Sequence, residues 1–232
     1  MSITGAKRVL VAAVITTAVV TGLSYALPER YAATGVGLAF LAATWLMVLR
    51  GEDALVPHFG LSLGGLLEAK AIDPRRVATD GLKALAWACG IAAVVFPLFW
   101  FGYRFWWKPV HLFAWVPPVS YSDEILGQIL VIALPEEAFY RGYVQTALDD
   151  AWGAKLKILG AKVGWGLVAS AVLFGIGHFL TEPRPERLAV FFPALLFGWL
   201  RARTGGVGAG IALHAMANIF SATLGRGYGL MH

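Results

Sequence analysis

The stretch GQILVIALPEEAFYRG, residues 127–142, places Glu136, Glu137 and Arg141 inside a long apolar run. Ionisable side chains are costly in lipid, so they pair with one another, face the interior of a helix bundle or line a water-filled cavity. A stretch of this kind predicts a membrane helix bundle with a polar site between its helices.

The rest of the chain has the composition of an integral membrane protein. Of its 232 residues, 58% are hydrophobic and 14% are charged, whereas soluble domains carry about 25% charged residues. Mean hydropathy is +0.68. The length leaves room for little beyond membrane crossings, so we expect a single membrane domain over 1–232. Although the net charge is +5, the basic residues are spread over the loops, which argues against a nucleic-acid partner.

Apolar runs long enough to span a membrane predict an all-α, polytopic bundle of about seven transmembrane helices, with a range of six to eight. The first run resembles a signal peptide but is long enough to span, so we interpret it as a retained helix. The predicted runs are 9–27, 31–49, 82–103, 124–148, 163–180, 188–200 and 206–224.

Lysine and arginine positions predict the orientation. With the N-terminus in the cytoplasm, twelve basic residues lie on the inner side and six on the outer side, as the positive-inside rule requires. The aromatic segment 100–107 then belongs to the outer interfacial belt. We therefore expect a bacterial inner (plasma) membrane protein with a cytoplasmic N-terminus.

The two carboxylates of the opening stretch are expected to differ in role. Glu137 and Arg141 are four residues apart, so they share a helix face and can pair. Glu136 lies about 100° around the helix from its neighbour and is the reactive carboxylate in this interpretation. Pro135 removes a backbone hydrogen bond and loosens the preceding turn, which makes room for water. The alternative is that both acids only neutralise Arg141.

Two further polar groups follow on later spans, at Phe174 to His178 and at His214 to Asn218. A carboxylate and a histidine can activate water for amide hydrolysis, and a second histidine with an asparagine can stabilise the oxyanion. Ser170 is eight residues from His178, so a Ser–His dyad is not expected. The chain has no HExxH zinc motif, but Glu136, His178 and His214 remain an alternative set of zinc ligands.

The motifs EExxxR (136–141), FxxxH (174–178) and HxxxN (214–218), in this order on successive apolar spans, resemble the CAAX-protease and bacteriocin-processing family of intramembrane endopeptidases. The resemblance covers about residues 120–224, the expected catalytic core. It implies a glutamate-type protease without a cofactor. It also implies roles for individual residues: Glu136 and His178 activate the water, His214 and Asn218 form the oxyanion hole, and Glu137, Arg141, Phe174 and Tyr140 support the site.

Some bacterial members that resemble this chain, the myxosortase-like group, are thought to process C-terminal sorting signals. The resemblance therefore implies a substrate protein or peptide that is anchored in the bilayer by a transmembrane helix. The short sixth run suggests an entrance for that helix near Phe191 and Phe192. The alternative outside enzymology is a membrane scaffold or bacteriocin-immunity protein, in which the polar residues only hold helices together.

Overall fold

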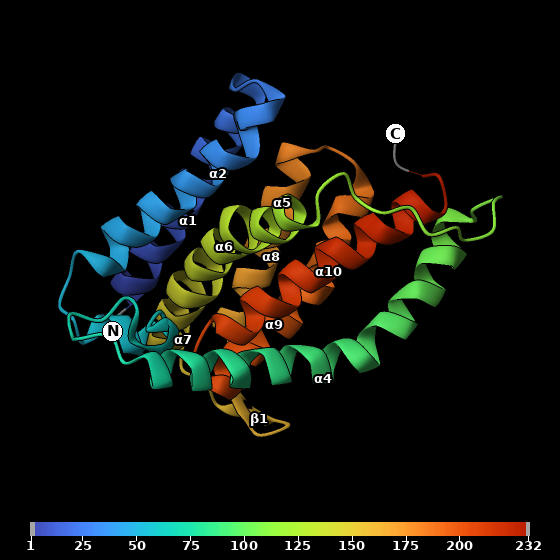
Figure 1. Ribbon diagram of the computed structural model, residues 1–232. Helices are drawn as coiled ribbons and strands as arrows, with labels where there is room; N and C mark the ends of the chain where they lie inside the picture. The colour runs from blue at the N-terminus through green and yellow to red at the C-terminus, as the bar shows by residue number, and fades with distance from the viewer. Residues whose placement is uncertain (1–2, 231–232) are drawn as a thin grey trace.

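The structure is a computed structural model that describes residues 3–230 as a helix bundle with one small β-hairpin (Figure 1). The α-helices are α1 (Ile3–Ala26), α2 (Glu29–Thr44), α3 (Leu55–His58), α4 (Pro74–Trp107), α5 (Tyr121–Leu126), α6 (Leu134–Glu137), α7 (Thr146–Trp152), α8 (Trp165–Thr181), α9 (Phe191–Thr204) and α10 (Gly208–Gly227). Short 3₁₀ helices are η2 (Leu63–Gly65) and η5 (Pro185–Val190), and π-helical segments are η1 (Trp45–Leu49), η3 (Gly127–Ala133) and η4 (Ala138–Gln145). The strands are β1 (Leu156–Ile158) and β2 (Ala161–Val163), which pair antiparallel.

Each apolar run that the sequence predicts coincides with a helix or with a continuous series of helical segments. In the part of the chain that the structure describes, three helices are long and apolar enough to cross a membrane: α1, α2 with η1, and α4. Helix α8 is shorter but also apolar. The prediction of a helical membrane protein is confirmed at this level, whereas the number of seven crossings stays a prediction. The β-hairpin is a departure from the expected all-α fold.

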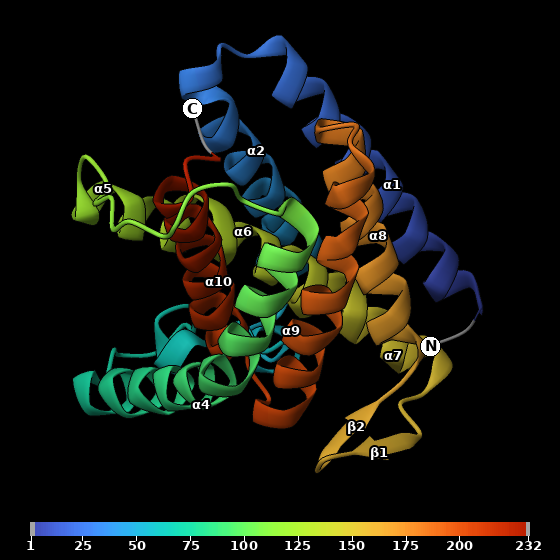
Figure 2. The same ribbon diagram turned by 90° about the vertical axis from the view of Figure 1, so that its right-hand side faces the viewer.

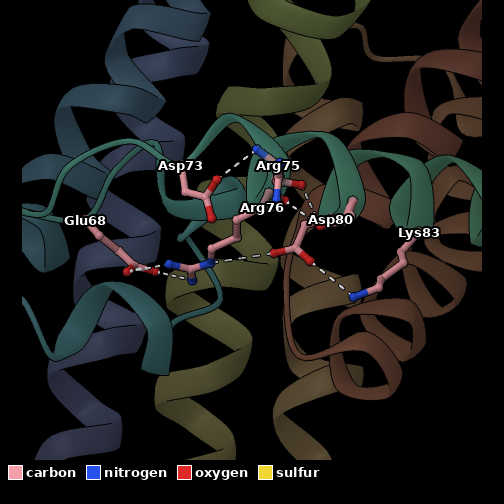
Figure 3. A network of polar contacts seen from close by, with 7 residues as sticks. Glu68, Asp73, Arg75, Arg76, Asp80 and Lys83 are labelled. Carbon is pink, nitrogen blue, oxygen red and sulfur yellow. Dashed lines mark hydrogen bonds and ion pairs between the residues drawn. The ribbon is translucent and has the colours of Figure 1, made fainter.

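Helix α4 begins eight residues earlier than the apolar run within it, because a polar cap starts it. Asp73 accepts a hydrogen bond from the backbone N–H of Arg75 at 2.9 Å. Arg76 then donates from both terminal nitrogens to Glu68, at 2.9 and 2.6 Å, and lies 3.9 Å from Asp80 (Figure 3). The Arg76 guanidinium lowers the pKa of Glu68 to about 2. This network fastens the loop before α4 to the first turns of the helix.

The segments α5, η3, α6, η4 and α7 form one continuous helical rod over residues 121–152, which we call the central helix. It runs through the middle of the bundle, with α1 and α2 on one side and α9 and α10 on another (Figures 1 and 2). Its α-helical turn with Pro135 lies between two π-helical segments. Such wide turns occur often at functional sites, and here they flank the two adjacent glutamates.

Candidate active site

Glu137 lies at the centre of the polar cluster, with an exposed fraction of 0%. Its Oε1 is 3.0 Å from Nη1 of Arg141 and 3.0 Å from Nδ1 of His214. The predicted pairing of Glu137 with Arg141 is therefore present, with His214 as an additional partner. Oε1 thus accepts a hydrogen bond from His214 and forms an ion pair with Arg141, so that Glu137 acts as a fixed counter-charge.

Arg141 is held by an aromatic face as well as by its ion pair. Its guanidinium carbon lies 4.3 Å from the centre of the Phe174 ring, and Nη2 is 3.4 Å from the carbonyl oxygen of Ala194. A desolvated guanidinium over an aromatic face gains about 2 kcal/mol. Phe174 thus places the arginine of the first motif against the second motif, which accounts for an aromatic residue at this position.

Glu136 is in a different situation from its neighbour. It is buried, but within residues 3–230 its Oε2 has no hydrogen-bond partner. Nε2 of His214 lies 3.7 Å from this oxygen, which is beyond hydrogen-bonding distance. Oε2 of Glu137 is likewise buried without a hydrogen-bond partner among the described residues, but it lies against Gly210 of α10. Glu136, in contrast, lines the cavity described below, so it is the carboxylate that is placed to bind another molecule.

His178 is oriented by its own helix. Nδ1 lies 3.2 Å from the carbonyl oxygen of Phe174, and because a carbonyl can only accept, this nitrogen carries the proton. A neutral His178 therefore has an unprotonated Nε2, which can accept a proton. The side chain lines the same cavity as Glu136. Ser170, in contrast, donates to the carbonyl oxygen of Tyr140 at 2.8 Å and is used in packing.

His214 lies between the two glutamates and is stacked on Phe197, with ring centres 4.9 Å apart and an interplanar angle of 13°. Its Nδ1 proton is directed to Glu137. Consequently Nε2 accepts hydrogen bonds in the neutral ring and donates them only in the imidazolium form.

Asn218, the last of the four residues expected to be catalytic, is held by a residue that the sequence analysis missed. The Asn218 amide nitrogen donates to Oε1 of Gln128 at 2.8 Å. Gln128 belongs to η3 of the central helix, eight residues before Glu136. A polar side chain within an apolar run was the available signal, since such residues often form interhelical hydrogen bonds in membranes.

The site residues open into one cavity of about 1340 Å³. This volume is above the range of about 300–1,000 Å³ for small-molecule pockets and suits a segment of polypeptide. Phe192 lines the cavity and is 70% exposed, whereas Phe191 packs against the core. Motif residues in the lining are Glu136, Tyr140, Phe174, His178, His214 and Asn218.

The side chains proposed as alternative zinc ligands are not gathered as a metal site in this geometry. Within residues 3–230, no group of three His, Cys, Asp or Glu side chains is placed to hold a metal ion. What the arrangement offers is a free carboxylate, an accepting histidine nitrogen and an amide around a cavity. These groups can bind water and a carbonyl, and can transfer protons between them.

Comparison with known proteins agrees with the resemblance found in the motifs. A family model described as type II CAAX prenyl endopeptidase Rce1-like matches residues 118–220. The matched segment contains all three motifs and coincides closely with the resemblance over 120–224. This match supports the assignment of the chain to the CAAX-protease and bacteriocin-processing family. No curated protein and no solved structure matches the chain.

Proposed function

We propose that this chain is an intramembrane endopeptidase of the CAAX-protease and bacteriocin-processing family, which hydrolyses a peptide bond of a membrane-anchored substrate with water activated by a glutamate. The observation that carries the proposal is the contrast between the two adjacent acids. Oε1 of Glu137 contacts Arg141 and His214, and its Oε2 lies against Gly210 of α10, away from the cavity lining. Glu136 lines the cavity, and its Oε2 has no hydrogen-bond partner among the described residues.

In the proposed reaction, Glu136 and Nε2 of His178 orient a water molecule at the scissile carbonyl. The water oxygen bonds to the carbonyl carbon while one of its protons passes to Glu136. The carbonyl oxygen becomes an oxyanion, which accepts hydrogen bonds from the imidazolium Nε2–H of His214 and from the Asn218 amide. Glu136 then gives its proton to the leaving nitrogen as the carbon–nitrogen bond breaks, and the two products are a carboxylic acid and an amine.

Glu137 has a supporting role in this scheme, since it accepts the hydrogen bond from Nδ1 of His214 and so fixes the orientation of the ring. Losing one donor of an oxyanion hole costs about 3–4 kcal/mol of transition-state stabilisation in well-studied proteases. Arg141 neutralises Glu137, and Phe174 holds Arg141.

For the substrate, we propose a protein with a C-terminal transmembrane helix whose sorting signal is cut, as in the myxosortase-like group. The volume of the cavity and the presence of the exposed side chain of Phe192 in its lining support an elongated substrate that enters from the bilayer. The proposed location is a bacterial inner membrane, by the resemblance to bacterial members of the family. The charge distribution supports a cytoplasmic N-terminus.

Cleavage by purified protein in vesicles tests the proposal, with a co-reconstituted substrate that carries a C-terminal transmembrane helix. We expect cleavage by wild type and a loss of at least about 100-fold in Glu136→Gln. Glu124→Gln is the matched control, because Glu124 lies on the same central helix but pairs with Arg226 at 2.8 Å, away from the two glutamates. Activity that persists in Glu136→Gln would sink the glutamate mechanism.

Treatment with a chelator in the same cleavage assay distinguishes the glutamate mechanism from the zinc-dependent alternative. We expect full activity after treatment with a chelator and no zinc bound in stoichiometric amount. Activity that disappears with the chelator and returns with zinc would replace the glutamate mechanism with a metal-dependent one that uses the same side chains.

A further inference from the structure

The β-hairpin between α7 and α8 has a surface that none of the preceding roles explains. It projects from the bundle beside the ends of these two helices (Figures 1 and 2). Ala161 and Val163 of β2 are buried against α9, and Trp199 of α9 donates to the carbonyl oxygen of Ile158 at 2.9 Å. The hairpin is therefore held in a fixed position on a predicted membrane helix.

The outer face of the hairpin carries two lysines that oppose each other directly. Lys157 pairs with Lys162 across the strands, and both side chains are exposed. Like charges in directly opposite positions are destabilising in a sheet. Within residues 3–230, neither lysine makes an ion pair, and exposed Lys155 next to them makes none either. A cluster of this kind matches a partner that supplies several negative charges.

The tip of the hairpin indicates what kind of partner this is. Leu159 and Gly160 form the two-residue turn, with φ of +46° and +83°. Turns with two positive φ angles favour Asn-Gly or Asp-Gly, and a leucine in the left-handed region costs about 1 kcal/mol or more. Leu159 is nevertheless there, and 83% of it is exposed. A strained and exposed leucine is favoured at this position if its side chain is placed in apolar surroundings.

Exposed tryptophans occupy both ends of the same connection. Trp152 ends α7 and is 40% exposed, and Trp165 begins α8 and is 70% exposed. Tryptophan is enriched where a membrane meets water. The connection thus has a leucine at its tip, lysines behind the tip and tryptophans at its base. This combination of apolar, basic and aromatic side chains is typical of an element that lies in a lipid interface.

We propose that this hairpin binds the anionic phospholipid headgroups of the leaflet next to it, with Lys157 and Lys162 at the phosphates and Leu159 among the acyl chains. The lipid removes the repulsion between the lysines and gives the leucine an apolar environment. Because α8 starts two residues after β2 and carries His178, the bound hairpin also sets the depth of that helix. The inference does not depend on the proposed proteolysis.

A fluorescent probe beside the tip tests the inference. Cys89, the single cysteine, is replaced by alanine, and Ile158→Cys is labelled with an environment-sensitive nitrobenzoxadiazole group. The labelled protein is reconstituted in vesicles of phosphatidylcholine with increasing fractions of phosphatidylglycerol. We expect the emission to shift to shorter wavelength as the anionic fraction rises, and added salt to reverse the shift.

Two variants and one control make the result specific. Lys157→Gln with Lys162→Gln should lower the ratio of inserted to exposed probe about fivefold for each lysine removed. Leu159→Asn should relieve the turn and still weaken the spectral shift. Lys70→Gln with Lys83→Gln removes the same charge elsewhere and should leave the shift unchanged. An emission that ignores the anionic lipid, or that responds equally to both lysine pairs, would overturn the inference.

Discussion

Adjacent isosteric substitutions at Glu136 and Glu137 should have opposite consequences for stability and for activity. Glu137→Gln removes a fully buried charge that lies 3.0 Å from both Arg141 and His214. Arg141 is 1% exposed, so it would be left without its counter-ion. Removing one partner of a buried ion pair costs about 3–5 kcal/mol, which corresponds to a Tm lowered by roughly 6–20 °C in a chain of this size.

Glu136→Gln should be much less damaging to the fold, because its Oε2 has no hydrogen-bond partner that the substitution could remove within the described residues. We expect a free energy of unfolding within about 1 kcal/mol of wild type. Cleavage should nevertheless be lost, as the amide cannot take a proton from water. The same substitution at two adjacent residues thus distinguishes a residue that stabilises the site from a residue that takes part in the reaction.

Thermal unfolding in detergent, followed by tryptophan fluorescence, measures the first effect, and substrate cleavage in vesicles measures the second. A double variant, Glu137→Gln with Arg141→Met, supplies the control, since removal of both charges should recover much of the lost Tm. The reasoning would be refuted by equal Tm values for the two single variants, or by a Glu136→Gln protein that unfolds far below Glu137→Gln.

Three further outcomes follow from particular contacts. Gln128→Leu removes the acceptor that holds the α10 asparagine, a neutral hydrogen bond worth about 1 kcal/mol; turnover should fall more than Tm, and a kcat lowered with KM unchanged is the signature to look for. Gly37→Ala places a methyl group against the backbone of η3, so we expect about 1–3 kcal/mol of destabilisation, whereas Gly22→Ala, with open space around it, serves as the control in the same unfolding assay. Arg76→Gln should return the pKa of Glu68 from about 2 toward its ordinary 4.5, measurable by carboxyl carbon NMR; since this pKa is lowered in the fold, the contribution of the pair is present above pH 4.5 and is lost only as pH falls toward 2.

Spacing along the chain was sufficient for features that lie within one helix. Glu137 and Arg141 are four residues apart, and they pair although Arg141 lies in a π-helical segment where the spacing of turns is wider. The apolar runs located the helices because lipid requires about 20 apolar residues to cross it. The polar start of α4 was missed, since the cap at Asp73 and the ion pair from Arg76 to Glu68 are local polar interactions that hydropathy does not detect.

Partners on different helices could not be predicted from spacing. His214 was expected in the oxyanion hole with no partner predicted for it within the protein, whereas its Nδ1 contacts Glu137, 77 residues earlier in the chain. Gln128 and Asn218 are 90 residues apart. Spacing shows which residues share a face of a helix, whereas the opposing residue depends on how the helices pack. The hairpin was missed for another reason, because its Leu159–Gly160 turn lacks the usual Asn-Gly or Asp-Gly signal.

Packing of α10 on the central helix explains how one contact surface assembles the whole site. Positions 210, 214 and 218 of α10 are four residues apart and share a face. A side chain at Gly210 would come within 3.0 Å of Oε2 of Glu137, so the absence of one lets the α10 backbone approach that carboxylate. One turn later His214 contacts the other oxygen of Glu137, and a further turn on Asn218 reaches Gln128. As α10 advances by eight residues, its contacts move back along the central helix by nine, which is the pattern of an antiparallel pair. All three contacts therefore belong to one register, and a shift by a single turn would remove the histidine, the asparagine and the close approach together. The HxxxN motif is then part of a longer GxxxHxxxN pattern. Its glycine allows the close approach of α10 to the central helix, and its histidine and asparagine form the polar contacts at that separation.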